Sequence, residues 1–554
     1  MVLGVTVAVA QTPSPNAPPV AAPAQRAASA PAQAAPSPSR TAQAPAVSPA
    51  VPPAVAARAP QLYAQHCATC HGVQRLGGMG PALLPESLAR IKKAEVLSVV
   101  RDGRPATQMA GFAQQLSADE IAALGEWIYT PVSPAPRWTE ADITASREVT
   151  AGWKDWPAKP QWRADPMNLF VVVEAGDHHV SLLDGDRFEV IHRFASRFAL
   201  HGGPKFTPDG RYVFFGSRDG WITKFDLWNL KTVAEVRAGL NMRNIAVSGD
   251  GRWVMAANYL PHTLALFDAD LNLVRTYEAR ALDGQQSSRV SAVYDAEPRK
   301  SFVVALKDIP ELWEISYDPK AAPIYDGYVH DYQMKEGLAR PGYQGVRRTP
   351  LEEPLDDFFF SPDYAYALGA SRPHADGSPS GQVVNLDARR KIATLPIAGM
   401  PHLGSGITFE HGGRRVMASP NLKDGRISVI DMQSWQLVKD IDTPGPGFFM
   451  RSHEATPYAW VDSMMSPTAK DTLTILDKRT LAPVAQVREP GKTLAHIEFT
   501  QDGRYALASL WENDGALIVY DASSFKEVKR LPMKKPVGKY NVFNKITRSE
   551  GTSH

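Results

Sequence analysis

The sequence predicts two folded domains of different class: a small all-α domain and, after it, an all-β propeller of eight blades. Residues 61–131 have apolar residues at helical spacing, and Ser117 and Glu120 form an S-x-x-E capping box at the start of the last helix. From about residue 166, short apolar runs that end in Asp recur, mostly at intervals of 42 to 50 residues. A repeat in the forties with about four strands per unit is typical of a β-propeller, and eight copies indicate eight blades.

The repeated runs share a turn as well as a final aspartate. Sequences such as TPDGRYVFF and SGDGRWVMA precede many of the runs, as a turn before a strand would. The one long interval holds the insertion IYDGYVHDYQMKEGLARPGYQ. The aspartates that end the eight runs are Asp184, Asp226, Asp268, Asp318, Asp387, Asp431, Asp477 and Asp521.

The segment HCATCHG contains the only two cysteines of the 554-residue chain, Cys67 and Cys70. Two thiols separated by two residues and followed directly by a histidine are what covalent attachment of haem c requires, with His71 as an iron ligand. A redox disulfide or half of a zinc site would not call for the adjacent histidine, and a second cysteine pair is absent from the sequence. The all-α domain is therefore interpreted as a cytochrome c domain.

The iron of haem c needs a sixth ligand, and a methionine thioether is the usual partner of histidine in a small electron-transfer cytochrome. The two candidates are Met79, in LGGMGPAL, and Met109, in ATQMAGF. We favour Met109, because it lies in a loop between two expected helices, far enough along the chain to reach the opposite face of the haem.

The first sixty residues are expected to lie outside both folded domains. Residues 1–10 end in an A-x-A-like pattern but lack a basic start, so they are interpreted as the remnant of a signal peptide. Residues 11–60 contain 18 Ala and 13 Pro and no Asp or Glu, which predicts a disordered, helix-free tether. Because covalent haem is normally assembled outside the cytoplasm, we expect the protein in the periplasm. The other expected boundaries are 61–131 for the cytochrome c domain, 132–165 for a linker, 166–545 for the propeller and 546–554 for a C-terminal tail.

Composition excludes two classes of partner. A formal net charge of +2 over 554 residues gives no basis for binding nucleic acid or an anionic membrane surface. No later run approaches the roughly twenty apolar residues of a membrane-spanning helix. The mature chain is therefore expected to have no membrane span.

Several polar side chains are expected at one mouth of the propeller channel, where the innermost strand of each blade begins. Histidines for an iron and arginines for carboxylates would suit a metallated, polyanionic macrocycle. A single histidine at a strand end more often bonds a neighbouring turn, so the argument depends on several blades contributing. The expected residues are His201, Arg243, His402, His453 and His496 at strand starts, with Arg218, Tyr259, Lys307, Asp308, Trp511 and Asn513 in loops.

A cytochrome c domain followed by an eight-bladed propeller resembles the cytochrome cd1 nitrite reductase family, from residue 61 to the GKYNVFN near the end. The resemblance implies that the propeller binds haem d1 noncovalently, with His201 as the proximal iron ligand. It also implies that Arg218, Arg243 and Tyr259 line the haem d1 pocket.

One departure from that family concerns its pair of distal histidines, which deliver protons to nitrite. The loop VALKDIPELW offers Lys307 and Asp308 where the first is expected, whereas the second is retained as His402. Lysine is a poor proton donor at its ordinary pKa. The chain is therefore similar to the dihydro-haem d1 dehydrogenase branch, to which LGGMGPALLPE and ALKDIPELWEI also correspond.

That resemblance implies that dihydro-haem d1 is the substrate and that one of its propionates is oxidised to the acrylate of haem d1, with electrons leaving through haem c. The reaction needs a base, for which His453 is the first choice and Tyr458 the second, because both were expected on one mouth segment. His402 is interpreted as a distal iron ligand. The roles of these three residues are interchangeable at this stage.

Two other functions remain open from the sequence: a working nitrite reductase, and a non-enzymatic carrier of haem d1. The expected partners are the tetrapyrrole substrate and a periplasmic electron acceptor such as a small cytochrome or cupredoxin. The cytochrome cd1 nitrite reductase is a further expected partner, as the recipient of haem d1.

Overall fold

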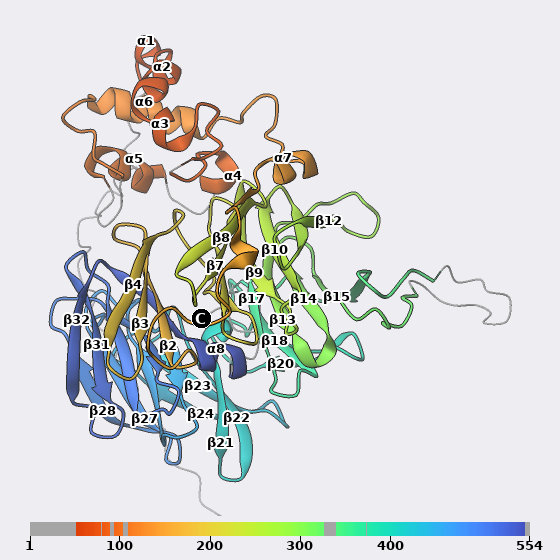
Figure 1. Cartoon of the computed structure of the whole chain (residues 1–554), viewed down its shortest axis with the longest axis vertical. Coiled ribbons are helices and arrows are strands. Elements are labelled where there is room, and N and C mark those ends of the chain that lie inside the picture. Colours follow the sequence, from red (N-terminus) through yellow and green to blue (C-terminus); the bar gives the residue numbers. More distant parts are fainter. Residues whose placement is uncertain are drawn as a thin grey trace, which may run out of the picture. The chain divides into compact units, whose positions relative to one another are not determined.

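The computed structural model describes residues 51–548 except 79, 89–92, 104–108, 326–338 and 373 (Figure 1). Its first part is helical, as the sequence predicts. The side chains of Leu62, Tyr63 and Leu124 are buried in its core, and the capping box at Ser117 and Glu120 is confirmed. The helices are α1 (Pro53–Ala56), α2 (Ala59–His66), α3 (Ala68–His71), α4 (Pro85–Leu88), α5 (Lys93–Asp102) and α6 (Ala118–Ile128).

The structure differs from the predicted domain boundaries in two short segments, one just before residue 61 and one between residues 132 and 165. The expectation of no helix before residue 61 is wrong at its end, because Pro53 opens α1, where its missing N–H costs nothing and its fixed φ suits the first turn. Residues 132–165 pack against the propeller, where Trp138 donates a hydrogen bond to the Arg237 carbonyl (2.8 Å). This segment contains α7 (Glu140–Ala145), β1 (Glu148–Val149) and the 3-10 turn η1 (Trp153–Asp155), and β1 pairs with β8.

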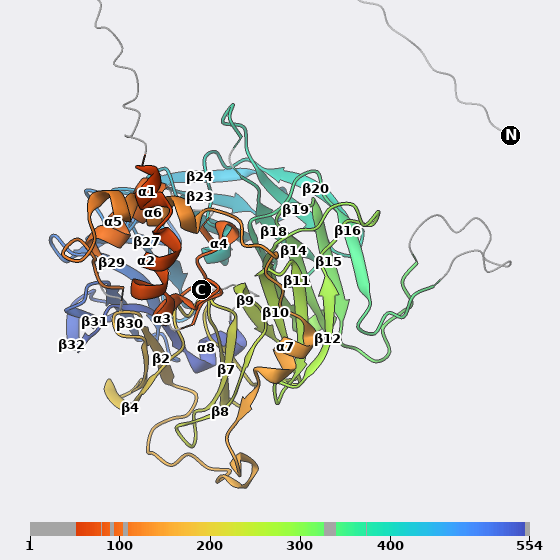
Figure 2. The same cartoon turned by 90° about the horizontal axis from the view of Figure 1, so that it is seen from above.

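The rest of the described chain forms eight antiparallel sheets arranged as the blades of a ring (Figure 2), which confirms the predicted propeller. Blade 1 is β33 (Pro536–Asn541), β2 (Leu169–Glu174), β3 (His179–Asp184) and β4 (Glu189–Ala195). Blade 2 is β5 (Lys205–Phe206), β6 (Tyr212–Gly216), β7 (Trp221–Asp226) and β8 (Lys231–Arg237). Blade 3 is β9 (Asn241–Val247), β10 (Trp253–Leu260), β11 (Thr263–Asp268) and β12 (Leu273–Glu278). Blade 4 is β13 (Val290–Ala296), β14 (Ser301–Leu306), β15 (Glu311–Ser316) and β16 (Val346–Pro350), with the 3-10 turn η2 (Glu297–Arg299) between β13 and β14.

The other four blades follow the same order from the inner to the outer strand. Blade 5 is β17 (Asp357–Phe360), β18 (Tyr366–Ala370), β19 (Gly381–Asn385) and β20 (Arg390–Leu395). Blade 6 is β21 (Ile407–His411), β22 (Arg414–Pro420), β23 (Arg426–Asp431) and β24 (Leu437–Asp442), preceded by the 3-10 turn η3 (Leu403–Ser405). Blade 7 is β25 (Met450–Ser452), β26 (Tyr458–Asp462), β27 (Thr472–Asp477) and β28 (Ala482–Arg488). Blade 8 is β29 (Leu494–Phe499), β30 (Tyr505–Leu510), β31 (Gly515–Asp521) and β32 (Glu527–Met533).

The ring is closed by the last strand of the chain. β33 pairs with β2, with Tyr540 opposite Val171, so the inner strand of blade 1 comes from the C-terminal end and its other strands come from the N-terminal end. The helix α8 (Val542–Thr547) follows β33 and packs against β5, β2 and β33. Closure in this way leaves no unpaired edge at the point where the two ends of the propeller meet.

The repeated aspartate has a structural reason. Asp431 ends β23, the third strand of its blade, and its Oδ1 accepts hydrogen bonds from the backbone amides of Gln433 and Ser434. Such a carboxylate stabilises the tight turn to the outer strand. In blade 5 this role belongs to Asn385, whose Oδ1 accepts from the amides of Asp387 and Ala388, so the repeat position was predicted two residues too late there. The insertion lies between β15 and β16.

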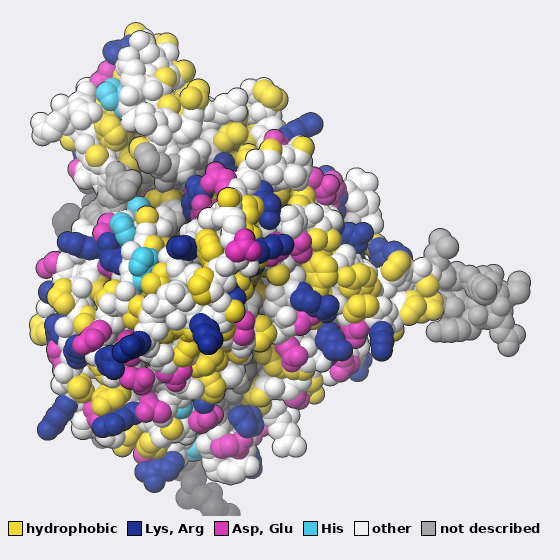
Figure 3. Space-filling view, in the orientation of Figure 1, with side chains coloured by type: hydrophobic (Ala, Val, Ile, Leu, Met, Phe, Trp, Pro, Cys, Tyr) yellow, Lys and Arg dark blue, Asp and Glu magenta, His cyan; other side chains and the backbone are white. Residues whose placement is uncertain are grey.

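The cores lie between neighbouring blades, as in the cluster of blades 3 and 4 that contains the fully buried Phe302 and Trp313. Over the face shown in Figure 3, Lys and Arg side chains alternate with Asp and Glu, so the charge of that face is mixed in sign. Within the described ranges, none of the helices has the length and apolar composition needed to cross a membrane.

We predict that Gly503→Ala destabilises the propeller by about 3 kcal/mol, because this glycine has a φ of +72° and an added Cβ would lie 2.2 Å from Nδ1 of the buried His453. Gly413→Ala is the matched control, with a φ of +76° and open space around the added Cβ, and should cost about 1 kcal/mol. Urea unfolding followed by tryptophan fluorescence measures both. Equal losses of stability would show that the contact with His453 is unimportant.

Candidate functional site

The covalent haem site is built on the short helix α3. Cys67 immediately precedes this helix and Cys70 lies within it; both are free thiols and partly exposed. The His71 side chain is buried, and its Nδ1 lies 2.8 Å from the carbonyl oxygen of Pro81, which fixes the proton on Nδ1 and leaves Nε2 as the nitrogen for a metal. Gly80 lies so close that a Cβ would be 2.7 Å from the imidazole Cε1. Two thiols and an oriented imidazole fit haem c.

The sixth ligand of this iron stays a prediction. Met109 lies in the connection between α5 and α6, where its carbonyl oxygen approaches Gly103 closely. This is the loop position that the sequence argument expected. Met79, the alternative ligand, lies outside the described residues.

At the mouth of the propeller, the structure brings His201, Arg218 and Arg243 together. Nδ1 of His201 lies 2.8 Å from the Arg243 carbonyl oxygen, so it carries the proton and Nε2 carries the lone pair. The Arg218 guanidinium lies 3.0 Å from this Nε2 and that of Arg243 lies 3.2 Å from it. The imidazole therefore has the tautomer that an iron ligand needs, and two guanidinium groups, which could pair with carboxylates of a ligand, lie beside it.

Tyr259 is part of the same group. Its ring lies beneath two guanidinium groups, those of Arg218 (5.8 Å to the ring centre) and Arg289 (5.6 Å). Arg289 in turn forms an ion pair with Asp308. Sequence reasoning missed Arg289, although its place directly before the inner strand β13 matches the places of the predicted residues in their own blades.

Two acidic residues of blade 5 also face this region, and neither was predicted. The ammonium group of the buried Lys307 forms an ion pair with Asp356. The carboxylate of Asp357 accepts hydrogen bonds from the Tyr294 hydroxyl (2.6 Å) and Arg243 (3.4 Å). Lys307 is therefore held in place by an anion at the position where the resemblance led us to expect a proton-donating histidine.

His402 lies on the far side of the channel from His201. His201 precedes the inner strand of blade 2 and His402 precedes that of blade 6, and in a ring of eight blades these are opposite one another (Figure 2). Nδ1 of the buried His402 lies 2.8 Å from the Phe448 carbonyl oxygen, so its proton is on Nδ1 as well. Burial is the main cause that lowers the pKa of this histidine. A flat ligand between the two imidazoles would face the Nε2 atom of one histidine on each side.

The predicted placement of His453 and Tyr458 at the mouth is wrong. Both follow the inner strand β25, whereas His201 and His402 precede theirs, so they lie at the opposite end of the channel. Both ring nitrogens of His453 are engaged by backbone, through the Gln501 carbonyl (3.1 Å) and the Ala455 amide (3.0 Å). Tyr458 packs edge-on against Phe525.

His496, which the sequence placed at the mouth without a specific role, has the most unusual surroundings. It lies in the inner strand β29 at a β-bulge, with a φ of +50°. The side chain is 1% exposed, and its Nε2 has no hydrogen-bond partner among the described residues. The rings of Phe449 and Tyr540 contact it. A strained, buried polar side chain of this kind is typical of a functional position rather than of a stabilising one.

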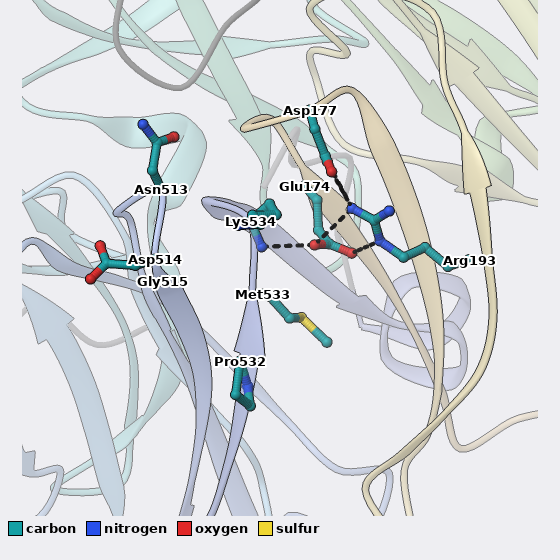
Figure 4. Close-up of a pocket in the computed structure, with 9 residues that line it drawn as sticks. All are labelled: Glu174, Asp177, Arg193, Asn513, Asp514, Gly515, Pro532, Met533 and Lys534. Atoms are coloured by element: carbon teal, nitrogen blue, oxygen red, sulfur yellow. Dashed lines mark hydrogen bonds and ion pairs between the residues drawn. The ribbon is translucent and has the colours of Figure 1, made fainter.

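A cavity with a volume of about 410 Å³ lies elsewhere in the described chain (Figure 4). It opens between blade 1 and the loops of blade 8, and no histidine lines it. Glu174 and Asp177 form ion pairs with Arg193 there, and Glu174 also accepts a hydrogen bond from the Lys534 amide. Because these charges already satisfy one another, this cavity is not the candidate site.

Hydrogen bonds connect the haem-binding domain to the mouth end of the propeller. Nη2 of Arg237, at the end of β8, donates to the carbonyl oxygen of Leu76 (2.7 Å), six residues after Cys70. Asn241, the first residue of the inner strand β9, donates to Ser87 Oγ (3.3 Å). The segment that carries the covalent haem therefore contacts the same end of the propeller at which His201 and the arginines lie.

A covalent-haem domain joined to an eight-bladed propeller, with opposed histidines and arginines at its mouth, defines a protein class that binds two iron tetrapyrroles. The chain belongs to the family described as "Cytochrome D1 heme domain", which matches residues 164–327 and 343–545. Residues 54–128 match the family "Cytochrome C oxidase, cbb3-type, subunit III". Haem c and a haem d1-type tetrapyrrole are the groups that these two families bind.

Among curated proteins, the chain is 54% identical to "Dihydro-heme d1 dehydrogenase" of Pseudomonas aeruginosa over 503 residues, covering 90% of this chain and 97% of that protein. It is 25% identical to "Nitrite reductase" of Stutzerimonas stutzeri over 538 residues, covering 87% of this chain and 92% of that protein. A solved structure, "Dihydro-heme d1 dehydrogenase NirN in complex with DHE", matches with a TM-score of 0.80 and 54% identity, covering 88% of this chain and 99% of that one.

We predict that Gly80→Ala displaces the His71 imidazole, because the added Cβ would lie closer to the ring than van der Waals contact allows. Absorption spectra should show loss of the histidine-ligated, low-spin haem c, while mass spectrometry still finds the haem attached to Cys67 and Cys70. Val73→Ala, at an 82% exposed side chain of the same loop, is the control and should leave the spectrum unchanged. An unchanged spectrum in Gly80→Ala would contradict the assignment of His71.

Proposed function

We propose that the chain is a periplasmic dihydro-haem d1 dehydrogenase, which oxidises one propionate of its tetrapyrrole substrate to an acrylate. The observation that carries the proposal is the pair of histidines on opposite blades, His201 and His402, with Arg218 and Arg243 beside them, in a chain that is similar over its length to a dehydrogenase of that name. Two histidines on opposite blades with arginines beside them would suit a flat, iron-containing polyanion better than a small anion alone.

The reaction removes two hydrogens from a CH2–CH2 unit and leaves CH=CH, which releases two protons and two electrons. The covalently bound haem c supplies one-electron redox chemistry, which suits a stepwise exit of electrons. Electrons are therefore expected to flow toward the segment around Leu76, which Arg237 contacts. The protons need an acceptor within the propeller.

We assign the proton acceptor to His496. Its pKa lies well below the ordinary 6.5, first because of burial and then because of the positive charges of Lys539, Arg451 and Lys545. The imidazole is therefore neutral at pH 7, as a base must be. Its neighbour Tyr540 has a raised pKa, caused mainly by burial, so the phenol keeps its proton at neutral pH. His453 and Tyr458 lie at the other end of the channel, so they are not assigned this role.

The alternative of nitrite reduction is disfavoured by Lys307. Rapid reduction of nitrite to nitric oxide and water needs two protons at the distal face, and the ammonium of Lys307 is buried in an ion pair with Asp356. A non-enzymatic carrier of haem d1 would need neither a strained histidine nor a covalent haem. The proposed partners are a small cytochrome or cupredoxin that accepts the electrons, and a cytochrome cd1 nitrite reductase that receives the product.

We predict that His496→Gln lowers the rate of dihydro-haem d1 oxidation by about 10²- to 10⁴-fold, because the base is lost. Binding of the substrate, followed by the change in its absorption spectrum, should be retained. His453→Gln is the matched control, a buried histidine at the far end of the channel, and should leave the rate unchanged. Loss of activity in His453→Gln with full activity in His496→Gln would refute the assignment.

The pH dependence follows from the lowered pKa of His496. Protonation removes the base, so the rate falls as pH decreases through the pKa of the folded protein, which lies below 6.5. We expect a level rate between pH 8 and about 6.5 and a decline only below that range. Single-turnover rates with bound dihydro-haem d1 measure the profile. A decline that begins above pH 7 would contradict a buried neutral histidine as the acceptor.

We also predict that the protein loaded with haem d1 and reduced under anaerobic conditions does not release nitric oxide rapidly from nitrite. Mass spectrometry of dihydro-haem d1 after oxidation should show the loss of two mass units. Stoichiometric nitric oxide release within the first turnover would favour the reductase, and an unchanged mass would favour the carrier.

A further inference from the structure

The side chain of Arg237, at the end of β8, bonds the haem-binding domain and the propeller at the same time. Its Nη2 donates a hydrogen bond to the carbonyl oxygen of Leu76 (2.7 Å), six residues after Cys70. Its Nε donates to the carbonyl oxygen of Asp219 (2.9 Å), in the turn between β6 and β7. Only 8% of Arg237 is exposed, so these bonds are shielded from water. One buried guanidinium group therefore links the segment of the covalent haem to a turn of blade 2.

The segment that joins the two domains fixes Arg237 as well. The backbone amide of Arg237 donates to the Ser146 hydroxyl (2.9 Å), and the Trp138 indole donates to the Arg237 carbonyl oxygen (2.8 Å). The guanidinium lies 5.0 Å from the centre of the Trp138 ring, where a cation–π interaction stabilises it. Because the backbone and the side chain are both held, the bond to Leu76 has a defined geometry.

The haem-binding segment has a backbone that admits this side chain. Gly77 has a φ of +86°, and an added Cβ would lie 3.2 Å from Nη2 of Arg237 and 3.0 Å from the backbone nitrogen of Ala82. The Gly77 amide donates a hydrogen bond to the carbonyl oxygen of His71 (2.9 Å), whose imidazole fits the haem c iron. The residue directly after Leu76 therefore connects the Arg237 contact to the iron-binding histidine.

Arg75, directly before Leu76, connects the same segment to the rest of the haem-binding domain. This arginine is 4% exposed, and its guanidinium donates to the carbonyl oxygens of Trp127 (2.9 Å) and Thr130 (2.8 Å) at the end of α6. The guanidinium also lies 4.5 Å from the centre of the Trp127 ring. Because Leu76 lies between two anchored residues, a bond to its carbonyl oxygen holds the domain and not only a loop.

The turn of blade 2 that Arg237 bonds also reaches the tetrapyrrole site. Arg218 directly precedes Asp219 in this turn, and Nη2 of Arg218 lies 3.0 Å from Nε2 of His201. The turn is rigid, because the Asp219 side chain is 1% exposed and its carboxylate accepts a hydrogen bond from the Ser217 hydroxyl. A single buried turn therefore contacts the histidine of the tetrapyrrole site directly and the haem c segment through Arg237.

We propose that Arg237 is the positioning residue for electron exit: it holds the segment of the covalent haem at a fixed separation from the tetrapyrrole site. This inference rests on the proposed function and adds to it the residue that aligns the two haem sites. Oxidation of CH2–CH2 to CH=CH releases two protons and two electrons. The electrons leave one at a time through haem c to an external one-electron acceptor, and the protons pass to the propeller. Because electron transfer slows steeply with distance, a loosened domain delays the electrons without changing how the substrate binds.

The test separates electron exit from substrate binding in the full-length protein with oxidised haem c. After rapid mixing with dihydro-haem d1, haem c of Arg237→Gln should be reduced roughly ten- to hundredfold more slowly than that of the wild type, as expected when a charged hydrogen bond is lost from the docked domain. Stopped-flow absorption of haem c measures this rate. The Kd of dihydro-haem d1 should be unchanged. Arg237→Lys keeps the charge and one donor, so it should restore part of the rate.

Arg147→Gln is the matched control. Arg147 belongs to the same joining segment and donates a hydrogen bond to the carbonyl oxygen of Asp270 (2.7 Å), which follows the third strand of blade 3 at the end of the propeller away from the mouth. Its loss should leave the reduction of haem c unchanged. A readout without tetrapyrrole is amide hydrogen exchange of residues 72–78, which should be faster in Arg237→Gln than in the wild type or in Arg147→Gln.

The outcomes distinguish this inference from the proposed function. If the wild type oxidises dihydro-haem d1 and Arg237→Gln reduces haem c at the same rate, the inference fails and the proposed function stands. Equal slowing in Arg147→Gln would show a general loss of stability and would also overturn the inference. Weaker substrate binding in Arg237→Gln, with the wild-type rate at saturation, would place Arg237 in the tetrapyrrole site instead. If the wild type does not oxidise dihydro-haem d1, the proposed function itself fails, and the inference fails with it.

Discussion

The structure depends on one constraint: eight inner strands converge on a narrow channel, so polar side chains on those strands are taken out of water. A buried imidazole or ammonium group is stable there only if it is neutral, paired or bound to a ligand. His201 and His402 meet the constraint by donating Nδ1–H to backbone carbonyls, which leaves each Nε2 as a base. Lys307 meets it by pairing with Asp356.

Much of the fold could be predicted, because the repeat can be recognised in the sequences of the turns. The aspartates at the ends of third strands bond the amides of the following turn, and the glycines of the inner turns adopt positive φ angles. Because each blade repeats these local requirements, their spacing predicts the number of blades. The haem c site could also be predicted, because Cys67, Cys70 and His71 are adjacent in sequence. Residues of the propeller channel, in contrast, come from different blades, and only the register of each inner strand decides which of them face the channel.

The error in the site arose in a blade whose turn differs from the repeated one, and a second irregularity lies at His496. Blade 7 has no DGR-type turn, and the comparable place before ATPYAWVD predicted His453 at the start of an inner strand, whereas it follows the end of one. At His496 a β-bulge adds one residue, and such a shift reverses the faces of a strand. Neither feature has a clear signature in a single sequence. The contacts of His453 with Gln501 and Ala455 show the structural role that a strand-end histidine more often has.

Comparison with the relatives explains how one scaffold supports different chemistry. A reductase must deliver protons to a small anion at the iron, whereas a dehydrogenase must remove protons from a side chain of the macrocycle. The first task needs acidic groups at the distal face, where this chain has the paired Lys307. The second needs a base near the periphery of the ring, which is the role proposed for His496 beside Tyr540. The two functions therefore differ in the part of the ligand that the reactive side chains must reach: the iron in a reductase, and a peripheral side chain in a dehydrogenase.

The same geometry separates the paths of electrons and protons. Arg237 and Asn241 contact the haem-binding domain at the mouth, where the inner strand β9 begins. His496, the proposed base, lies within the inner strand β29, two residues beyond its first residue. In the proposed reaction, the electrons would leave toward the covalent haem at the mouth, and the proton would be taken up by the imidazole of His496. The proposed reaction therefore sends the electrons and the proton to different parts of the protein.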